Sequence, residues 1–491
     1  MSRTTSILLL ELGVFLAVCF YLGYLGWKRS RDLAGYFVAN RQVGPVVSFL
    51  TYSATLFSAF TLVGMPGFFY THGIGSWAFI AFADAFMAVL IYFFGRKFWL
   101  LARRFNFVTP TELLRYRYDS TAVMVLGVLI STVFLLPYVA TQIVGIGKIV
   151  ESTTGGEISY FAVTLGFFLT VLFYTAFGGM RAVAWNDAFQ GVLLFVMSFA
   201  IALIFLYANW SSPQAMFQAV AQSKPALLSV PGPRGYFTYP VMISYFFLII
   251  SIPITQPQMT VRFFIPRSLD SMRFMMMSTP LYAFLILIPA LILGLGAAVV
   301  FPGLASGDLV LGQVLTTHTS ALVGGLVVCG VVAAAMSTVS GQLLVLGALA
   351  AKDLYLNTRP EKPRSEMAQV WVGRIAVLLA TLAAFLLSIN PPALIVELSI
   401  DSFAGTMQLV PAFLGGIFWK RATKTGALAS MVVGTAVFCC TNWGMDRQLL
   451  QGIHPGICGL VFGTVSFFAG SFAKGISAEE KERAEAVVAV R

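Results

Sequence analysis

The chain has 491 residues, of which 58% are hydrophobic and only 10% are charged. Soluble domains carry about 25% charged residues, so this composition excludes a soluble fold and indicates a protein that lies within a membrane. The net charge of +11 does not indicate nucleic-acid binding, because the basic residues lie in short clusters between apolar segments.

A transmembrane helix needs roughly 20 predominantly apolar residues. Thirteen segments meet this requirement, at residues 6–27, 45–71, 74–95, 120–147, 158–177, 185–208, 240–261, 274–302, 319–350, 368–389, 393–418, 425–443 and 453–473. The first is followed by basic residues rather than by a cleavage site, so we interpret it as a membrane helix and not as a signal peptide. The five cysteines all lie in apolar segments, which predicts neither disulfides nor a spaced metal site. The sequence therefore predicts an all-α polytopic membrane protein.

The basic residues predict the orientation, because cytoplasmic loops of membrane proteins are enriched in Lys and Arg. With an external N-terminus, 26 of the 31 Lys and Arg residues fall in cytoplasmic segments. The five that remain outside are Arg3, Lys148, Lys224, Arg234 and Arg447. We therefore expect an external N-terminus and a cytoplasmic C-terminus in a bacterial cytoplasmic membrane.

The spans group into a predicted domain organisation. It consists of a leading helix with its cytoplasmic loop (1–44), a first set of five helices (45–208), an external loop (209–239), a second set of five (240–418), two trailing helices (419–474) and a cytoplasmic tail (475–491). The external loop contains four prolines and could hold short helices over the entrance. The tail is charged and predicts a solvated helix.

Two spans carry Gly/Pro interruptions, namely Gly64-Met65-Pro66-Gly67 within 45–71 and the run from Ile252 to Gln258 within 240–261. Each span opens one set of five helices, and the sets are inverted because the first begins inside and the second outside. Such pairs are typical of transporters built from inverted repeats. Prolines also kink ordinary membrane helices, so both interpretations stay open. Unwound backbone in a membrane needs a partner such as a cation or a polar substrate.

The span at 319–350 supplies hydroxyl groups for such a cation, at Ser337 and Thr338. Ser337 lies fifteen residues from Lys352, and Ala54 lies thirteen from Arg41. Each separation is roughly 20 Å of helix, so the two positions can meet at similar depth. Sodium is a hard ion that prefers oxygen ligands, which makes these hydroxyls candidate ligands. The alternative is that they bond to their own helix within ordinary small-residue packing.

Ionisable residues inside a membrane are candidates for function by default. Here they are Asp84, Asp187, Arg262, Glu397 and Asp401. Asp187 lies six residues after Arg181, near the expected cytoplasmic mouth, where it could lead a cation out or pair with a basic loop. Asp84 lies midway along its span and needs a partner or a proton. In the fourth span, Tyr138 and Gln142 are four residues apart and therefore share one helix face.

The most specific motif of the chain is the run from Tyr174 to Asp187, with Gly178-Gly179 and Trp185-Asn186-Asp187. Further motifs are Asn40-Arg41, Gly64-Met65-Pro66-Gly67, Gln256-Pro257-Gln258 with Arg262-Phe263, and Met336-Ser337-Thr338. Together these motifs resemble those of the sodium:solute symporter family. The resemblance extends from Leu12 to about Gly470. It implies a five-plus-five inverted repeat with one leading and two trailing helices, which works by alternating access driven by the sodium gradient.

The resemblance also implies roles for particular residues. It places a sodium site on the carbonyl groups of Ala54, Phe57 and Ala334 and on the hydroxyl groups of Ser337 and Thr338. It assigns Asp187 to the sodium path and Arg41 to coupling. Leu56 stands where proline carriers place an aspartate, and Thr61 stands where sugar carriers place a glutamine, so these two substrates are less expected.

Within the family, the similarity to pantothenate/sodium symporters is greatest at residues 354–360 and at Asn186-Asp187. The similarity to bacterial monocarboxylate carriers lies at residues 136–142. Both substrate types carry a carboxylate. The candidate substrate-binding residues are Phe60, Thr61, Tyr138, Gln142, Gln256 and Gln408. No buried arginine is clearly placed to pair a carboxylate, so neutral donors or bound sodium would have to do so.

We therefore expect a sodium-coupled symporter that imports a small organic solute, first of all a monocarboxylate or a pantothenate-like carboxylate. Its expected partners are this small molecule, the sodium ion and membrane lipid, without a cofactor or nucleic acid. Symport of an amino acid such as proline, or of another neutral solute, is the alternative. An integral membrane enzyme is not favoured, because no HExxH or GxSxG-like motif occurs. A channel is not favoured, because the sequence has no filter-like repeats. An ATP-driven pump is not favoured, because the sequence has no phosphate-binding loop.

Overall fold

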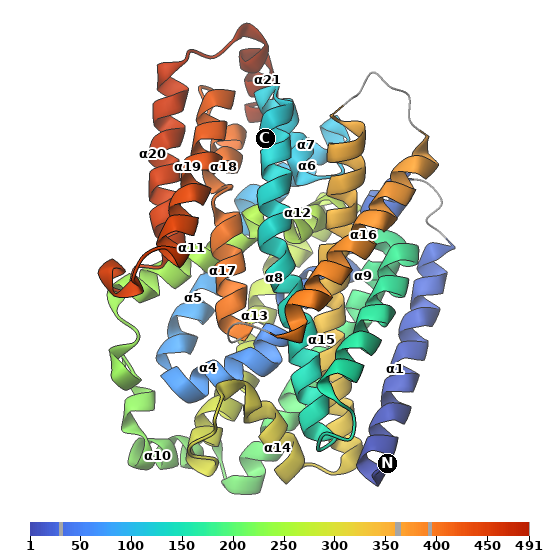
Figure 1. Cartoon of the computed structure of the whole chain (residues 1–491), viewed down its shortest axis with the longest axis vertical. Helices are drawn as coiled ribbons and strands as arrows, with labels where there is room; N and C mark the ends of the chain where they lie inside the picture. The colour runs from blue at the N-terminus through green and yellow to red at the C-terminus, as the bar shows by residue number, and fades with distance from the viewer. Residues whose placement is uncertain (29–32, 359–364, 391–394, 491) are drawn as a thin grey trace.

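The computed structural model describes residues 1–28, 33–358, 365–390 and 395–490. Most of these residues form helices, and the longer ones run along the long axis of the molecule (Figure 1). The N-terminus and the C-terminal helix lie at opposite ends of this axis. Predicted features at Arg29, Arg31, Arg359 and Pro360 lie outside the described residues.

The first half of the chain begins with α1 (Arg3–Trp27), α2 (Leu33–Val38) and η1 (Ala39–Arg41). The first predicted set of helices then comprises α3 (Pro45–Leu56), η2 (Phe60–Gly64), α4 (Met65–His72), α5 (Gly75–Leu90), η3 (Ile91–Gly95), α6 (Arg96–Phe105), α7 (Pro110–Tyr118), α8 (Thr121–Thr153) and α9 (Tyr160–Asn209). The predicted external loop does hold short helices, which are α10 (Pro213–Ser223), η4 (Pro225–Leu228) and η5 (Pro233–Gly235).

The second predicted set comprises α11 (Tyr239–Thr255), α12 (Pro257–Phe264), α13 (Leu269–Val300), η6 (Gly307–Leu309), α14 (Val310–His318), α15 (Ala321–Ala348), η7 (Leu349–Leu356), α16 (Glu366–Ile389), α17 (Ile395–Met407) and α18 (Val410–Phe418). The chain ends with α19 (Lys424–Trp443), η8 (Arg447–Leu450), α20 (Pro455–Ala473) and α21 (Ala478–Val488).

Within the described residues, nine helices are long and apolar enough to cross a membrane, or eleven if each of two bent pairs is one span. Two of the predicted spans fall short of that length. Of 158–177, the stretch Tyr160–Phe173 is a shorter apolar helix. The span 393–418 begins outside the described residues and continues as α17 and α18. The prediction of an all-helical polytopic membrane protein is confirmed.

Both interrupted spans are bent, by 53° between α3 and the helix Phe60–His72 and by 46° between α11 and α12. The second break lies where it was predicted, at Gln256, whose backbone is extended because the Pro257 ring disfavours helical geometry in the residue before it. The first break lies at Phe57, so the prediction that the Gly64–Gly67 run interrupts the helix is wrong. Pro66 is in the first turn of α4, where a missing N–H costs little, directly after the π-helical η2.

The two spans predicted at 158–177 and 185–208 are joined by a kink at one glycine instead of a loop. Gly179 has a φ of 67°, which favours glycine, and a Cβ atom there would lie 3.0 Å from the ring of Tyr36. The second span therefore begins at Gly178 and not at residue 185. Asp187 lies inside this helix, and its side chain is fully buried.

The C-terminal tail packs against other helices of the bundle. On α21, Glu480, Ala484 and Val487 are buried. Glu480 Oε1 accepts a hydrogen bond of 2.9 Å from the backbone N–H of Lys424, and Arg483 forms an ion pair with Asp119 at 2.9 Å. The prediction of a solvated helix is therefore wrong, because one face of α21 covers α7 and α18 (Figure 1).

Candidate functional site

The break after α3 brings carbonyl groups close to hydroxyl groups of α15. The last carbonyls of a helix have no intrahelical partner. Ser337 Oγ lies 2.8 Å from the Ala54 carbonyl oxygen and 2.9 Å from that of Ala334, and donates to them. Thr338 Oγ1 lies 3.2 Å from the carbonyl oxygens of Thr55 and Ala334. Four of the five predicted sodium ligands therefore meet at this break, with the Thr55 carbonyl as an unpredicted neighbour.

The fifth predicted ligand, Phe57, is the extended residue of the break itself. Its side chain is buried, and its ring lies 5.5 Å from that of Tyr282 on α13. The aromatic contact holds the residue in place while its backbone leaves the helix.

The predicted pair on α8 reaches the same break from another side. Gln142 Oε1 accepts a hydrogen bond of 3.1 Å from the backbone N–H of Ala59, which the break has exposed. The hydroxyl groups of Tyr138 and Ser58 lie 3.3 Å apart. Both α8 side chains are buried, so their shared face points into the helix bundle, as predicted from their spacing.

The break at Gln256 lies against α17. Gln256 Nε2 donates to Thr406 Oγ1 at 2.8 Å, and Gln258 Nε2 donates to Gln256 Oε1 at 3.0 Å. On α17, the Phe403 ring lies 5.0 Å from that of Tyr138 and 6.4 Å from that of Phe60. Phe403 therefore joins two predicted substrate residues into one aromatic wall.

Several residues of this site were not predicted. Ser58 escaped because the break was expected seven residues further along. Phe403 and Thr406 are three residues apart on a helix, which places both on one face, but the sequence does not show which face looks inward. Thr61, which was predicted, is buried beside the break and donates its backbone N–H to the carbonyl oxygen of Ser58.

A buried ion pair joins α9 to α12 beside the site. Arg262 Nη2 is 2.8 Å from Asp187 Oδ2, and neither side chain has any exposed surface. The same carboxylate oxygen accepts a hydrogen bond from the Thr51 hydroxyl, while Arg262 also donates to the carbonyl oxygens of Thr51 and Gln258. Asp187 therefore pairs with a residue on the broken α11–α12 span and not with a basic loop. Asp187 Oδ1 is buried without a hydrogen bond, so one oxygen remains open to a further partner.

Two predicted site residues lie away from this group. Gln408 Nε2 donates to the carbonyl oxygens of Ala404 and Gly456, which directs its side chain toward α20. Arg41 donates to Asn106 Oδ1 at 2.8 Å and to the Phe107 carbonyl oxygen at 2.9 Å, in the turn between α6 and α7. Burial lowers the pKa of Arg41, and the nearby Arg103 charge lowers it further.

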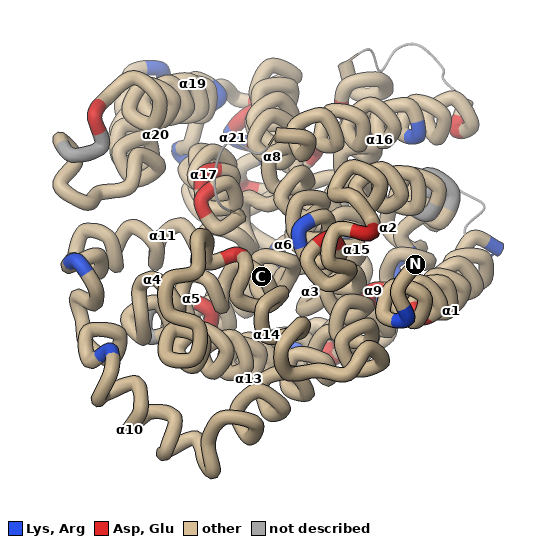
Figure 2. The backbone as a smooth tube through the Cα atoms, turned by 60° about the horizontal axis from the view of Figure 1, so that its bottom comes forward, with Lys and Arg blue, Asp and Glu red and all other residues tan. Residues whose placement is uncertain are grey.

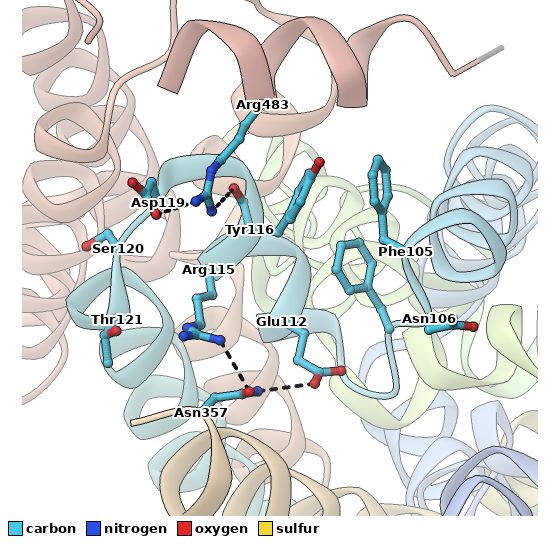
Figure 3. Close-up of a pocket in the computed structure, with 11 residues that line it drawn as sticks. Phe105, Asn106, Glu112, Arg115, Tyr116, Asp119, Ser120, Thr121, Asn357 and Arg483 are labelled. Carbon is cyan, nitrogen blue, oxygen red and sulfur yellow. Dashed lines mark hydrogen bonds and ion pairs between the residues drawn. The ribbon is translucent and has the colours of Figure 1, made fainter. Parts of the chain in front are cut away.

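A separate cavity of about 290 Å³ opens beneath α21 (Figure 3). Arg483 pairs there with Asp119, while Asn357 bridges Arg115 and Glu112. None of the predicted site residues lines it. The ends of four helices share this cavity with the docked tail.

Comparison with known proteins places this arrangement in context. A model of the sodium:solute symporter family matches residues 36–434. Sodium/pantothenate symporters of Haemophilus influenzae and Escherichia coli are 29% and 30% identical to the chain, each over 94% of this chain and 96% of the relative. An osmoregulated proline transporter of Bacillus subtilis is 27% identical over 94% of this chain and 93% of its own length.

Solved structures share the fold. A Na⁺-coupled sialic acid symporter superposes with a TM-score of 0.80 at 19% identity, covering 96% of this chain and 99% of the other. A nucleobase-cation-symport-1 family transporter in a closed conformation superposes with a TM-score of 0.60 at 13% identity, covering 92% and 99%. At these identities the likeness concerns the fold alone.

Proposed function

Because the chain belongs to the sodium:solute symporter family, we propose that it imports a small organic carboxylate together with Na⁺ by alternating access. It is a multi-pass protein of the plasma membrane and acts as a sodium-coupled symporter of a small solute. The observation that carries the proposal is the meeting of the Ser337 and Thr338 hydroxyl groups with the carbonyl groups at the end of α3.

In this proposal sodium is bound by the carbonyl oxygens of Ala54, Phe57 and Ala334 and the hydroxyl oxygens of Ser337 and Thr338. The two hydroxyl groups now donate to carbonyl oxygens. A hydroxyl can rotate and offer a lone pair to a cation instead, so the same atoms serve both states. Sodium would join α3 to α15 across the break and order the residues that follow it.

Sodium would leave to the cytoplasm past Asp187. The open Oδ1 atom supports this role, because an unpaired carboxylate oxygen attracts a cation. Arg41 would take part in coupling through the α6–α7 turn to which it is bonded.

The substrate would lie beside the two breaks, against Phe60, Thr61, Tyr138, Gln142 and Gln256, whereas Gln408 would support this wall from the side of α20. The amide and hydroxyl groups supply neutral donors, and Phe403 extends the aromatic wall. The relatives named above include sodium/pantothenate symporters and a proline transporter. Pantothenate is a carboxylate, which supports this substrate class. Proline is the second candidate because of the latter relative.

For the topology we propose thirteen spans, with α3–α9 and α11–α18 as inverted sets of five, an external N-terminus and a cytoplasmic C-terminus. The division into 1–44, 45–208, 209–239, 240–418, 419–474 and 475–491 follows from it. The two bent spans open the two sets, and the termini lie at opposite ends of the long axis (Figure 1). The bent spans support the two sets, and the termini at opposite ends support an odd number of spans.

Sodium-gradient uptake tests the function directly. Proteoliposomes with an inward sodium gradient are expected to accumulate a carboxylate such as pantothenate, whereas a potassium gradient should not drive accumulation. A thermal-shift screen of small carboxylates, proline and sugars, each in sodium and in potassium, identifies the substrate, because linkage requires sodium and substrate to reinforce each other. Equal stabilisation in both salts by every compound would contradict the proposal.

The close packing of the broken span against η6 predicts a strict size limit at Gly67. A Cβ atom at this position would lie 2.5 Å from the backbone carbon of Gly307, in η6. The external half of the broken span could then no longer pack against this loop. Gly67→Ala is expected to slow uptake by at least about tenfold, equivalent to 1.4 kcal/mol or more of packing strain.

The matched control is Gly166→Ala on α9, because a Cβ atom there meets nothing within 4 Å. Uptake by this variant should equal that of the parent. Parental uptake by Gly67→Ala as well would show that the close contact is not required for the cycle.

A further inference from the structure

The loop that carries α10, η4 and η5 has an unusual charge composition. Residues 209–239 contain Lys224 and Arg234 but no Asp or Glu. Basic positions and no acidic ones mark the stretch between α10 and α11 in Figure 2. This loop lies at the end of the molecule opposite to α21 (Figure 1), which is the external end in the proposed topology. The loop itself therefore carries two positive charges and no negative one, which favours the approach of an anion.

A cavity of about 410 Å³ lies beneath this loop. Its residues are Tyr70 and Thr71 of α4, Ala298 of α13, and Ser223, Lys224, Pro225, Ala226, Leu227 and Pro233 of the loop. Most of this lining is aliphatic. The hydroxyl groups are already engaged, because Thr71 donates to the Gly67 carbonyl oxygen and Ser223 to that of Ala219. Within the described part of the chain, no hydrogen bond or ion pair involves the Lys224 ammonium group.

The cavity is attached to the broken span that carries the proposed site. The backbone N–H of Ile74 donates to the Leu227 carbonyl oxygen at 2.7 Å, which fixes the loop to the end of α4. Tyr70 lies ten residues after Phe60, or about 15 Å of helix. An occupant of the cavity would therefore lie about 15 Å from the proposed substrate site, on its external side.

We propose that this cavity is an outer docking site for a small aliphatic carboxylate, held by the Lys224 ammonium group. The inference rests on the proposed function, because it assigns the docked anion to the same chemical class as the transported solute. A carboxylate accepts a charge-assisted hydrogen bond from an ammonium group, and the aliphatic lining covers its hydrocarbon part. The cavity beneath α21 is less suited to a carboxylate, because the carboxylates of Asp119 and Glu112 already face its arginines.

The test is binding of pantothenate to the full chain in sodium-free nanodiscs, measured by saturation-transfer NMR. Without sodium the central site is expected to bind weakly, so the outer site dominates the signal. Lys224→Ala should weaken binding by about tenfold, the usual worth of a charge-assisted hydrogen bond, and Lys224→Arg should restore it. The neutral alcohol analogue of pantothenate should bind equally to all three proteins.

Arg234→Ala is the matched control, because it removes the other positive charge of the loop from outside the cavity lining. It should change binding by less than about twofold. Parental binding by Lys224→Ala, or an equal loss in Arg234→Ala, would overturn the docking site. Failure of the proposed function is seen separately, as an absence of sodium-driven uptake in the parent, because the docking measurement contains no sodium.

Discussion

Replacement of Ser337 or Thr338 by alanine is expected to raise the sodium concentration for half-maximal uptake by about 10- to 100-fold. Each hydroxyl group would supply one of five oxygen ligands, and a hydrogen-bonding group that contacts a charge contributes about 1.5–3 kcal/mol. Both side chains are fully buried, so water cannot replace the missing oxygen cheaply. The measurement is the initial rate of uptake into proteoliposomes over a series of external sodium concentrations.

Two further variants separate this role from a structural one. Thr381→Ala and Ser198→Ala each remove a buried hydroxyl group that bonds to the carbonyl four residues earlier in its own helix. They should leave the sodium dependence unchanged. If Ser337 and Thr338 only cap the end of α3, their alanine variants will lower the unfolding temperature while keeping the parental sodium dependence, and the proposed ion site would be refuted.

The second large effect is expected at the Asp187–Arg262 ion pair. Removing one partner leaves an uncompensated charge at a fully buried position, which costs about 3–5 kcal/mol. Asp187→Asn and Arg262→Gln are therefore each expected to lower the thermal stability strongly and to abolish most uptake. In the double variant no net charge remains buried, so the unfolding temperature should recover by at least half of the loss.

The control for the ion pair is Arg273→Ala. Arg273 pairs with Asp270 at 3.1 Å, but the two side chains are 70% and 86% exposed, so the change should cost less than about 1 kcal/mol. The measurement is fluorescence-detected thermal unfolding in nanodiscs, combined with uptake. Strictly additive losses in the double variant would contradict the coupling between Asp187 and Arg262.

Recovery of stability without recovery of uptake would assign a further role to the carboxylate. Asp187 Oδ1 has no hydrogen-bond partner, and Arg262 occupies only the other oxygen. An asparagine preserves the shape but not the charge, so it should hold the fold in the neutral pair while failing to attract a cation. This outcome would support the proposed sodium path past Asp187.

Local chemistry explains which site residues the sequence predicted. Ser337 and Thr338 were found because two hydroxyl groups in an apolar span are conspicuous. Ala54 was found because the constant rise per residue of a helix gives its depth in the membrane from the number of residues that separate it from Arg41. Tyr138 and Gln142 were found from their helical spacing. None of these arguments needs a distant contact, and the structure brings all five residues to one break.

The predictions that were wrong depended on contacts between distant parts of the chain. The first break was expected at Gly64–Gly67, but proline is tolerated in the first turn of a helix, and the real break depends on Gln142 accepting the exposed N–H of Ala59. The tail was expected to be solvated because its charges are obvious, while the buried face of α21 becomes visible only against α7 and α18.

The amino-acid sequence by itself determined the all-helical membrane architecture, two interrupted spans and the hydroxyl groups of the candidate sodium site. These follow from composition, from the length that a bilayer demands and from helical periodicity, all of which act between residues close in the chain. Only the tertiary structure decided that Arg262 neutralises Asp187, that Gln408 faces α20 and that Lys224 borders a cavity beside α4. These contacts join residues that are tens to hundreds of positions apart in the chain. The pattern of residue types along the chain does not reveal which distant residues come together in space.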